Sequence, residues 1–321
     1  MNKLKIAFAG TPEFAAIHLK SLLEIKDFEI TCVYTKEDTK SGRGNKLNQS
    51  NVKLLALKNN LKVFQPKNFK TDADFLELKN QDFDVMVVVA YGIILPKRVL
   101  DLPRYGCINV HGSLLPKLRG AAPIQRSLLN GDLKTGVTIM HMDEGLDTGN
   151  MIYKVECDIT SLDTSGSLYT KLSEISPKAL IKVLMDMKNG LEVVSEKQDN
   201  AESTYAPKLS KEEARLDFAK SARVLDLEVR GFNPWPISYF EISSDVVVKV
   251  YKASPIEDKV FLKASLGEIV NFSKLGLDIK TQDGVFRIES VKFPGKKALN
   301  AQDFYNSKKD LFRVGLNIKD L

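Results

Sequence analysis

Residues 84–90 read DVMVVVA, a continuous apolar run that follows one aspartate. A strand that is apolar along its whole length is typical of a parallel sheet covered by helices on both faces. Similar runs lie at 5–10, 29–34, 107–111 and 136–142, with helix-like segments between several of them. Strands that alternate with helices predict an α/β fold with a mostly parallel sheet.

The chain changes character at residues 191–208, a polar stretch with few apolar residues. Beyond it, one helix-like segment is followed by short β-rich runs, and turn signals such as Gln282-Asp283-Gly284 separate these runs. This pattern is typical of a small β-barrel. A chain of 321 residues is long enough for two domains. We therefore expect a catalytic domain over 1–190, a linker over 191–208 and a β-barrel domain over 209–321.

Composition indicates an ordinary globular protein, since 43% of the residues are hydrophobic and the formal net charge is +6. This charge permits a polyanionic partner, but a lysine-rich solvated surface explains it equally well. Three distant cysteines without a CxxC pattern fit a reducing compartment and argue against a cysteine-bound metal. No apolar stretch approaches the roughly 18 residues of a membrane span, and we recognise neither a signal nor a transit peptide. We expect a cytoplasmic protein that binds no membrane and no metal.

Two polar residues close the apolar run at 107–111. Asn109 and His111 are two positions apart, so their side chains point to the same side of a strand. The carboxyl ends of parallel strands are where α/β sheets bind ligands. An amide N–H can stabilise an oxyanion, and an imidazole can carry a proton near neutral pH. A buried structural histidine is the alternative, and the pair alone does not exclude it.

Three loops complete the candidate site. Residues 142–150, MDEGLDTGN, could bring a carboxylate to the same edge of the sheet, or they form a solvated acidic turn. Residues 113–120, SLLPKLRG, could line a groove for a flat organic ligand, or they form a loop before a helix. The loop 36–46 contains Lys40, Arg43 and Lys46, and it is either a phosphate contact or a mobile solvated loop. The first turn has one glycine where a dinucleotide-binding motif has three, which disfavours NAD.

Six segments together resemble a known family. They are FAGTPEFA at 8–15, VVVAYGIILP at 87–96, GCINVHGSLLPKLRGAAPIQ at 106–125, GVTIMHMDEGLDTG at 136–149, TYAPKLS at 204–210 and GFNPWP at 231–236. Their order resembles the folate-dependent formyltransferases. The AAPIQ and FNPWP segments and the C-terminal domain narrow the resemblance to the methionyl-tRNA formyltransferases.

The resemblance implies a Rossmann-like formyltransferase domain followed by an open barrel similar to an oligonucleotide-binding fold. It also implies roles for named residues. The catalytic residues would be Asn109, His111 and Asp147, and the tetrahydrofolate contacts would be Ser113, Leu114, Leu115 and Pro116. The loop of Lys40, Arg43 and Lys46 would meet the tRNA acceptor stem. On the C-terminal domain, we single out Lys292, Lys296 and Lys297 as further candidates to bind tRNA.

The implied activity is transfer of the formyl group of 10-formyltetrahydrofolate to the α-amino group of methionyl initiator tRNA, by a monomer. The alternatives are another folate-dependent formyltransferase, a formyl hydrolase, and an RNA-binding module without activity. The sequence departs from the family pattern at Lys117, Leu118 and Asn150. None of these three positions belongs to the implied catalytic trio.

Overall fold

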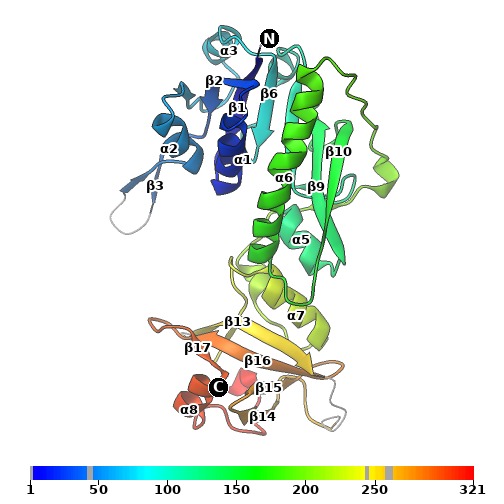
Figure 1. Cartoon of the computed structure of the whole chain (residues 1–321). Coiled ribbons are helices and arrows are strands. Elements are labelled where there is room, and N and C mark those ends of the chain that lie inside the picture. Colours follow the sequence, from blue (N-terminus) through cyan, green and yellow to red (C-terminus); the bar gives the residue numbers. More distant parts are fainter. Residues whose placement is uncertain (1–2, 42–45, 243–245, 257–262) are drawn as a thin grey trace. The chain divides into compact units, whose positions relative to one another are not determined.

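The computed structural model describes residues 3–41, 46–242, 246–256 and 263–321 (Figure 1). The chain forms two compact units, and each is discontinuous in sequence. The first contains Met1–Pro123, Lys134–Asp158 and Tyr169–Ala206, and the second contains Ile124–Leu133, Ile159–Leu168 and Pro207–Leu321. The domain limits expected from the sequence, at residues 190 and 208, stay a prediction.

A seven-stranded sheet forms the centre of the first unit, in the order β10-β9-β7-β6-β1-β2-β5. Its strands are β1 (Leu4–Gly10), β2 (Phe28–Tyr34), β5 (Val63–Phe64), β6 (Val85–Val89), β7 (Cys107–His111), β9 (Lys134–His141) and β10 (Met151–Asp158). The five strands from β7 to β5 are parallel, and β9 and β10 are antiparallel additions at one edge. The predicted α/β domain with a mostly parallel sheet is therefore confirmed.

Helices cover this sheet. The rings of Phe14 in α1 (Glu13–Leu23) and Tyr169 in α6 (Ser165–Lys188) lie 5.5 Å apart, so these two helices pack together. An apolar cluster joins α3 (Asp72–Lys79) and α4 (Lys97–Leu100) to alternate residues of β1, β2 and β6 and to Cys107 of β7. Hydroxyl caps begin two of the helices, because Ser50 accepts from the Lys53 amide at α2 (Asn51–Lys58) and Thr71 caps α3 in the same way.

Two short two-stranded sheets in the first unit include residues of the predicted loops. The strands β3 (Thr39–Ser41) and β4 (Lys46–Asn48) form an antiparallel hairpin. The strand β8 (Arg119–Gly120) pairs in parallel with β11 (Tyr205–Ala206). The polar segment expected to be a linker therefore returns to the first unit and adds a strand there, with the short helix η1 (Asn200–Glu202) before it.

An antiparallel sheet dominates the second unit, as the expected β-rich domain requires. Its order is β12-β13-β16-β15-β14, with β17 paired to β16. The strands are β12 (Tyr239–Glu241), β13 (Val247–Ile256), β14 (Ile269–Ser273), β15 (Gly276–Lys280), β16 (Val285–Lys292) and β17 (Leu299–Asn300), and the helical segments are α5 (Pro123–Leu129), η2 (Glu212–Ala214), α7 (Ala222–Gly231), α8 (Ala301–Lys308) and η3 (Ile318–Asp320). Residues of α7, α8 and the sheet share one apolar core. None of the helices in the described part of the chain has the length and apolar character that a membrane crossing needs.

Candidate active site

The strand β7 places Asn109 and His111 at its carboxyl end, as the sequence predicts. Asn109 is paired with Val88 of β6 on one side, and His111 is paired with Thr138 of β9 on the other. The two side chains are two residues apart on one strand and so share a face of the sheet. Asn109 is half-buried and His111 is buried, 5% exposed.

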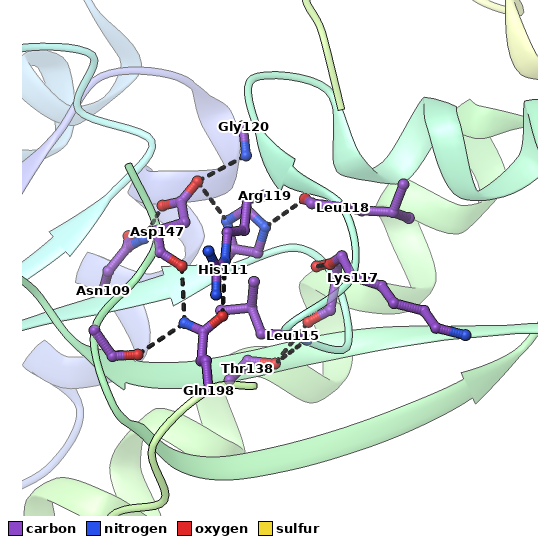
Figure 2. Close-up of polar contacts among 12 residues, drawn as sticks. Asn109, His111, Leu115, Lys117, Leu118, Arg119, Gly120, Thr138, Asp147 and Gln198 are labelled. Atoms are coloured by element: carbon purple, nitrogen blue, oxygen red, sulfur yellow. Dashed lines mark hydrogen bonds and ion pairs between the residues drawn. The ribbon is translucent and has the colours of Figure 1, made fainter. Parts of the chain in front are cut away.

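The two ring nitrogens of His111 have different partners (Figure 2). Its Nε2 lies 2.9 Å from the carbonyl oxygen of Leu118. A carbonyl only accepts hydrogen bonds, so Nε2 carries a hydrogen and donates it. Its Nδ1 lies 3.5 Å from Oδ2 of Asp147. The nitrogen that faces the carboxylate is therefore Nδ1.

The loop between β9 and β10 brings Asp147 to this pair. Asp147 has the left-handed backbone angle φ 54°, and its Oδ2 accepts a hydrogen bond from the Gly120 amide at 2.8 Å. Its Oδ1 lies 3.4 Å from Nδ2 of Asn109. The structure thus brings together the amide, the imidazole and the carboxylate, which are up to 38 residues apart in sequence.

These contacts permit proton transfer and stabilisation of negative charge. A primary amide has two N–H groups, so Asn109 keeps one for a ligand when the other meets Asp147. The distances of 3.4 and 3.5 Å are at the long end for hydrogen bonds, and catalytic hydrogen bonds often tighten only when substrate is bound. A doubly protonated imidazole at His111 would find one acceptor at each ring nitrogen.

Neighbouring side chains that could attack a substrate are held in unreactive states. Burial raises the pKa of the Cys107 thiol to about 12, so the thiol stays protonated. The hydroxyl of Ser113 donates to the carbonyl oxygen of Lys117 at 2.7 Å instead of to a ring nitrogen of His111. The geometry therefore suits a reaction in which the substrate supplies the nucleophile.

The stretch predicted to contact tetrahydrofolate is a turn fixed to β9. The hydroxyl of Thr138 donates to the Ser113 carbonyl at 2.7 Å and accepts from the Leu115 amide at 3.1 Å. Ser113 and Leu115 are buried, whereas Leu114 and Pro116 are half-buried. The latter two side chains are thus the ones with surface left for a ligand, and the binding role of all four stays a prediction.

Two further residues of the site come from the polar segment 191–208. Gln198 donates to the carbonyl oxygens of Asp147 and Gly149, and Thr204 accepts from the Leu118 amide at 2.9 Å. Thr204 belongs to the TYAPKLS segment, so the family resemblance offers a signal for it. Gln198 lies outside all six motif segments, and sequence reasoning missed it.

Of the three departures from the family pattern, one contacts the trio, and it does so through its backbone. Leu118 contacts His111 through its backbone carbonyl, which any residue could supply. The side chain of Lys117 is exposed, and that of Asn150 is exposed with its amide 3.4 Å from Ser195.

The candidate tRNA contacts lie in separate units. Arg43 lies outside the described residues, and only the backbone of Lys40 and Lys46 is described, in β3 and β4. In the second unit, Lys292 ends β16 and is half-buried, while Lys296 and Lys297 are exposed in the following turn. Their roles stay predictions. Across the described ranges, no group of three or more His, Cys, Asp or Glu side chains is arranged to hold a metal ion.

Comparison with known families gives two matches. The formyl transferase family matches residues 3–184, and the C-terminal domain of formyl transferases matches residues 208–309. Together the two matches include every residue of the trio and most of the second unit.

Solved structures of similar fold include proteins of three different kinds. HypX from Aquifex aeolicus has a TM-score of 0.61 and 16% identity over 97% of this chain, which spans about half (50%) of HypX. An N-formyltransferase from Helicobacter canadensis, in complex with folinic acid and dTDP-3-aminofucose, has a TM-score of 0.65 and 20% identity, covering 90% of this chain and 99% of that one. Methionyl-tRNA formyltransferase from Clostridium thermocellum has a TM-score of 0.56 and 17% identity, covering 80% of this chain and 95% of that one. At these identities the likeness is one of fold.

Proposed function

The chain belongs to the formyl transferase family, and from this premise we propose that it transfers a formyl group from 10-formyltetrahydrofolate to the α-amino group of methionyl initiator tRNA. The observation that carries the proposal is the convergence of Asn109, His111 and Asp147 at the end of β7. These three side chains match the chemistry of formyl transfer, which needs an oxyanion stabilised and a proton moved.

The amine of the acceptor attacks the formyl carbon and forms a tetrahedral intermediate whose oxygen is negatively charged. The free N–H of Asn109 donates a hydrogen bond to this oxygen, and the positive charge of the protonated His111 ring stabilises it. Removing one such donor typically costs about 3–4 kcal/mol of transition-state stabilisation. Asp147 balances the charge of the imidazolium. It also accepts the proton of the attacking amine through water. The oxyanion then re-forms the carbonyl as the bond from the formyl carbon to N10 breaks, and N10 takes up the proton that Asp147 accepted from the amine.

An amine acceptor agrees with the state of the neighbouring side chains. The Cys107 thiol is neutral and the Ser113 hydroxyl is bound to a backbone carbonyl. Neither can form an acyl-enzyme with help from His111, whose ring nitrogens have other partners. Direct attack by the substrate is therefore the simplest mechanism.

Three observations support a tRNA as the carrier of that amine. Residues 208–309 match the C-terminal domain of formyl transferases. The fold also resembles a methionyl-tRNA formyltransferase over most of both chains. Lys296 and Lys297 offer exposed cations in the second unit, and polyanion binding relies on such residues. A nucleotide-linked amino sugar is the second candidate acceptor, because the Helicobacter canadensis enzyme is similar over 90% of this chain.

An acceptor assay with the full chain tests the proposal. Purified protein and 10-formyltetrahydrofolate are incubated with methionyl initiator tRNA, methionyl elongator tRNA, dTDP-3-aminofucose or no acceptor. We expect formylation of the initiator tRNA, at least about 100-fold slower formylation of the elongator tRNA, and little free formate. Formylation of the amino sugar alone would establish the second candidate. Rapid formate release without acceptor would identify a hydrolase, and no turnover in any arm would contradict formyl transfer itself.

A further inference from the structure

We propose that Gln198 is a positioning residue that holds Asp147 in the orientation that serves His111. The inference deepens the proposed function and rests on it for the role of Asp147. Gln198 comes from the polar segment between α6 and β11, and its side chain reaches the loop that carries Asp147 (Figure 2). Among the hydrogen bonds and ion pairs of the described residues, none joins the Gln198 side chain to His111 or Asn109.

Every polar group of the Gln198 side chain is used. Its Nε2 donates to the carbonyl oxygens of Asp147 and Gly149, both at 2.8 Å. Its Oε1 accepts from Nε of Arg119 at 2.9 Å. The residue is 4% exposed. A buried amide with two donors and one acceptor in use has a fixed orientation, because turning it would leave polar groups unpaired.

The backbone at Asp147 needs such support. Its φ of 54° lies in the left-handed region, which is unfavourable for a residue with a side chain by about 1–3 kcal/mol. Gly149 is packed closely on its other side, where an added Cβ would lie 2.0 Å from the His141 carbonyl oxygen. The two hydrogen bonds from Gln198 therefore fix the loop on both sides of Thr148.

Gln198 also connects this loop to the strand that holds the carboxylate. Arg119 donates to Gln198, and the next residue, Gly120, donates its amide hydrogen to Oδ2 of Asp147. This strand, β8, is in turn paired with β11, the strand that follows Gln198 in sequence. Gln198 thus holds the backbone carbonyl of Asp147, and the strand β8 holds its side-chain carboxylate. We call Gln198 and β8 together the framework of Asp147. The contact from Asp147 to His111 is already 3.5 Å, so a small displacement would break it.

The variant Gln198→Glu removes the hydrogen bonds that the side chain donates and keeps the one that it accepts. A carboxylate has nearly the same shape and still accepts from Arg119, but it has no N–H for the Asp147 and Gly149 carbonyls. We expect kcat to fall about 10- to 100-fold, the range for a misplacement near 1 Å. The KM values for donor and acceptor should change less than about threefold, because uniform binding is not affected. The matched control is Asn200→Ala, which removes a second partner of Arg119 and should leave kcat within about twofold.

Amide hydrogen exchange gives a measurement that needs no activity. The Gly120 amide donates to Asp147, whereas the adjacent Arg119 amide donates to the Thr204 carbonyl. In Gln198→Glu we expect the Gly120 amide to exchange at least about 10-fold faster, while the Arg119 amide keeps its rate. If the glutamate variant does not fold, Gln198→Asn serves instead, because it keeps the amide group on a shorter side chain. We expect the same faster exchange of the Gly120 amide in Gln198→Asn.

Wild-type kcat and an unchanged Gly120 exchange rate in a folded variant would overturn the inference. Equal acceleration at Gly120 and Arg119 would also overturn it, because it would show a general loosening of β8. A wild-type protein that does not formylate methionyl initiator tRNA would contradict the proposed function instead. The exchange comparison would still decide whether Gln198 holds Asp147.

Discussion

Two of the three histidines in the chain are buried in contrasting surroundings. His18 lies in α1, beside the ring of Phe14 at 4.6 Å between centroids. Its Nδ1 is 2.7 Å from the Phe14 carbonyl, and its Nε2 has no hydrogen-bond partner among the residues that the structure describes. His111 at the end of β7 has a carbonyl at one nitrogen and a carboxylate at the other.

Burial has a different meaning in these two places. At His18 it lowers the pKa to about 4, because the charged ring would lose hydration and find only one carbonyl in return. At His111 an imidazolium would have an acceptor at each nitrogen, one of them negatively charged. Burial alone therefore produces a neutral packing residue, and the convergence of Asp147 from a distant loop is what makes the second histidine suitable for proton transfer.

The largest expected effect tests this difference directly. Asp147→Asn keeps the size of the side chain but removes its charge, so His111 loses the group that balances an imidazolium. We expect kcat to fall about 10²- to 10⁴-fold, the usual contribution of general acid–base catalysis. His18→Leu should leave kcat within about twofold, since the side chain of His18 on α1 is buried in the core. Steady-state kinetics with saturating donor and methionyl initiator tRNA measure both.

Binding of the acceptor is the control for the Asp147 variant. Its Kd for methionyl initiator tRNA should stay close to that of the wild type, because the tRNA contacts that we propose lie elsewhere. A loss of tRNA affinity as large as the loss of turnover would contradict the assigned role, and so would a large loss of turnover in His18→Leu at full stability.

The next effect concerns the pH dependence of stability. The pKa of His18 is about 4 in the folded chain and about 6.5 when exposed, so the unfolded chain binds more protons between these values. The free energy of unfolding therefore falls as the pH drops from 6.5 towards 4. For His18 this loss amounts to about 2–3 kcal/mol between pH 7.5 and pH 4.5. His18→Leu should lack this part, as measured by urea unfolding at the two pH values. An identical pH dependence in wild type and variant would show that His18 is not held neutral.

Much of the fold could be predicted because its signals are local. The apolar run at 84–90 predicts a strand covered on both faces, and β6 (Val85–Val89) is buried at every position. The run at 107–111 corresponds to β7 residue for residue, so it places Asn109 and His111 at the end of a strand. Asp147 is assigned by the resemblance, since the acidic loop on its own is better explained as a solvated turn.

The contacts that hold the trio in place could not be predicted. Gln198 contacts Asp147 although the two residues are 51 positions apart in sequence. The contact exists because β11, in the segment 191–208, pairs with β8. A polar segment without periodicity gives no sign of such a path, and from its sequence it predicts a linker. The Leu118 carbonyl and the Gly120 amide are backbone groups, which carry no side-chain signal at all.

A smaller effect is expected at Gly120, whose amide connects β8 to Asp147. Its φ is 118°, and an added Cβ would lie 2.8 Å from the Ala206 carbonyl oxygen and 2.6 Å from the Tyr205 ring. Gly120→Ala should therefore weaken the β8–β11 pairing by about 1–3 kcal/mol and lower kcat about tenfold as the amide moves from Asp147. Gly190→Ala is the matched control, because Gly190 has φ 71° with no atom within 4 Å of the added Cβ. It should lose about 1 kcal/mol of stability and no turnover. Equal kinetic losses in both variants would mean that strain alone, and not the contact with Asp147, causes them.

The smallest expected effect on kcat concerns Thr138, which lies next to His111 but makes no hydrogen bond to its ring. Thr138 is paired with His111 across β7 and β9, but its hydroxyl binds the Ser113 carbonyl and the Leu115 amide instead of the imidazole. Thr138→Val leaves these two backbone groups unpaired in a buried place, which should cost about 1–3 kcal/mol in unfolding free energy. The kcat should change less than about threefold, because Leu118 and Asp147 still hold both ring nitrogens. Thermal unfolding and steady-state kinetics on the same preparation measure the two effects. A fall in kcat that approached the effect of Asp147→Asn would show that the turn at 113–116, and not the carboxylate alone, sets the position of His111.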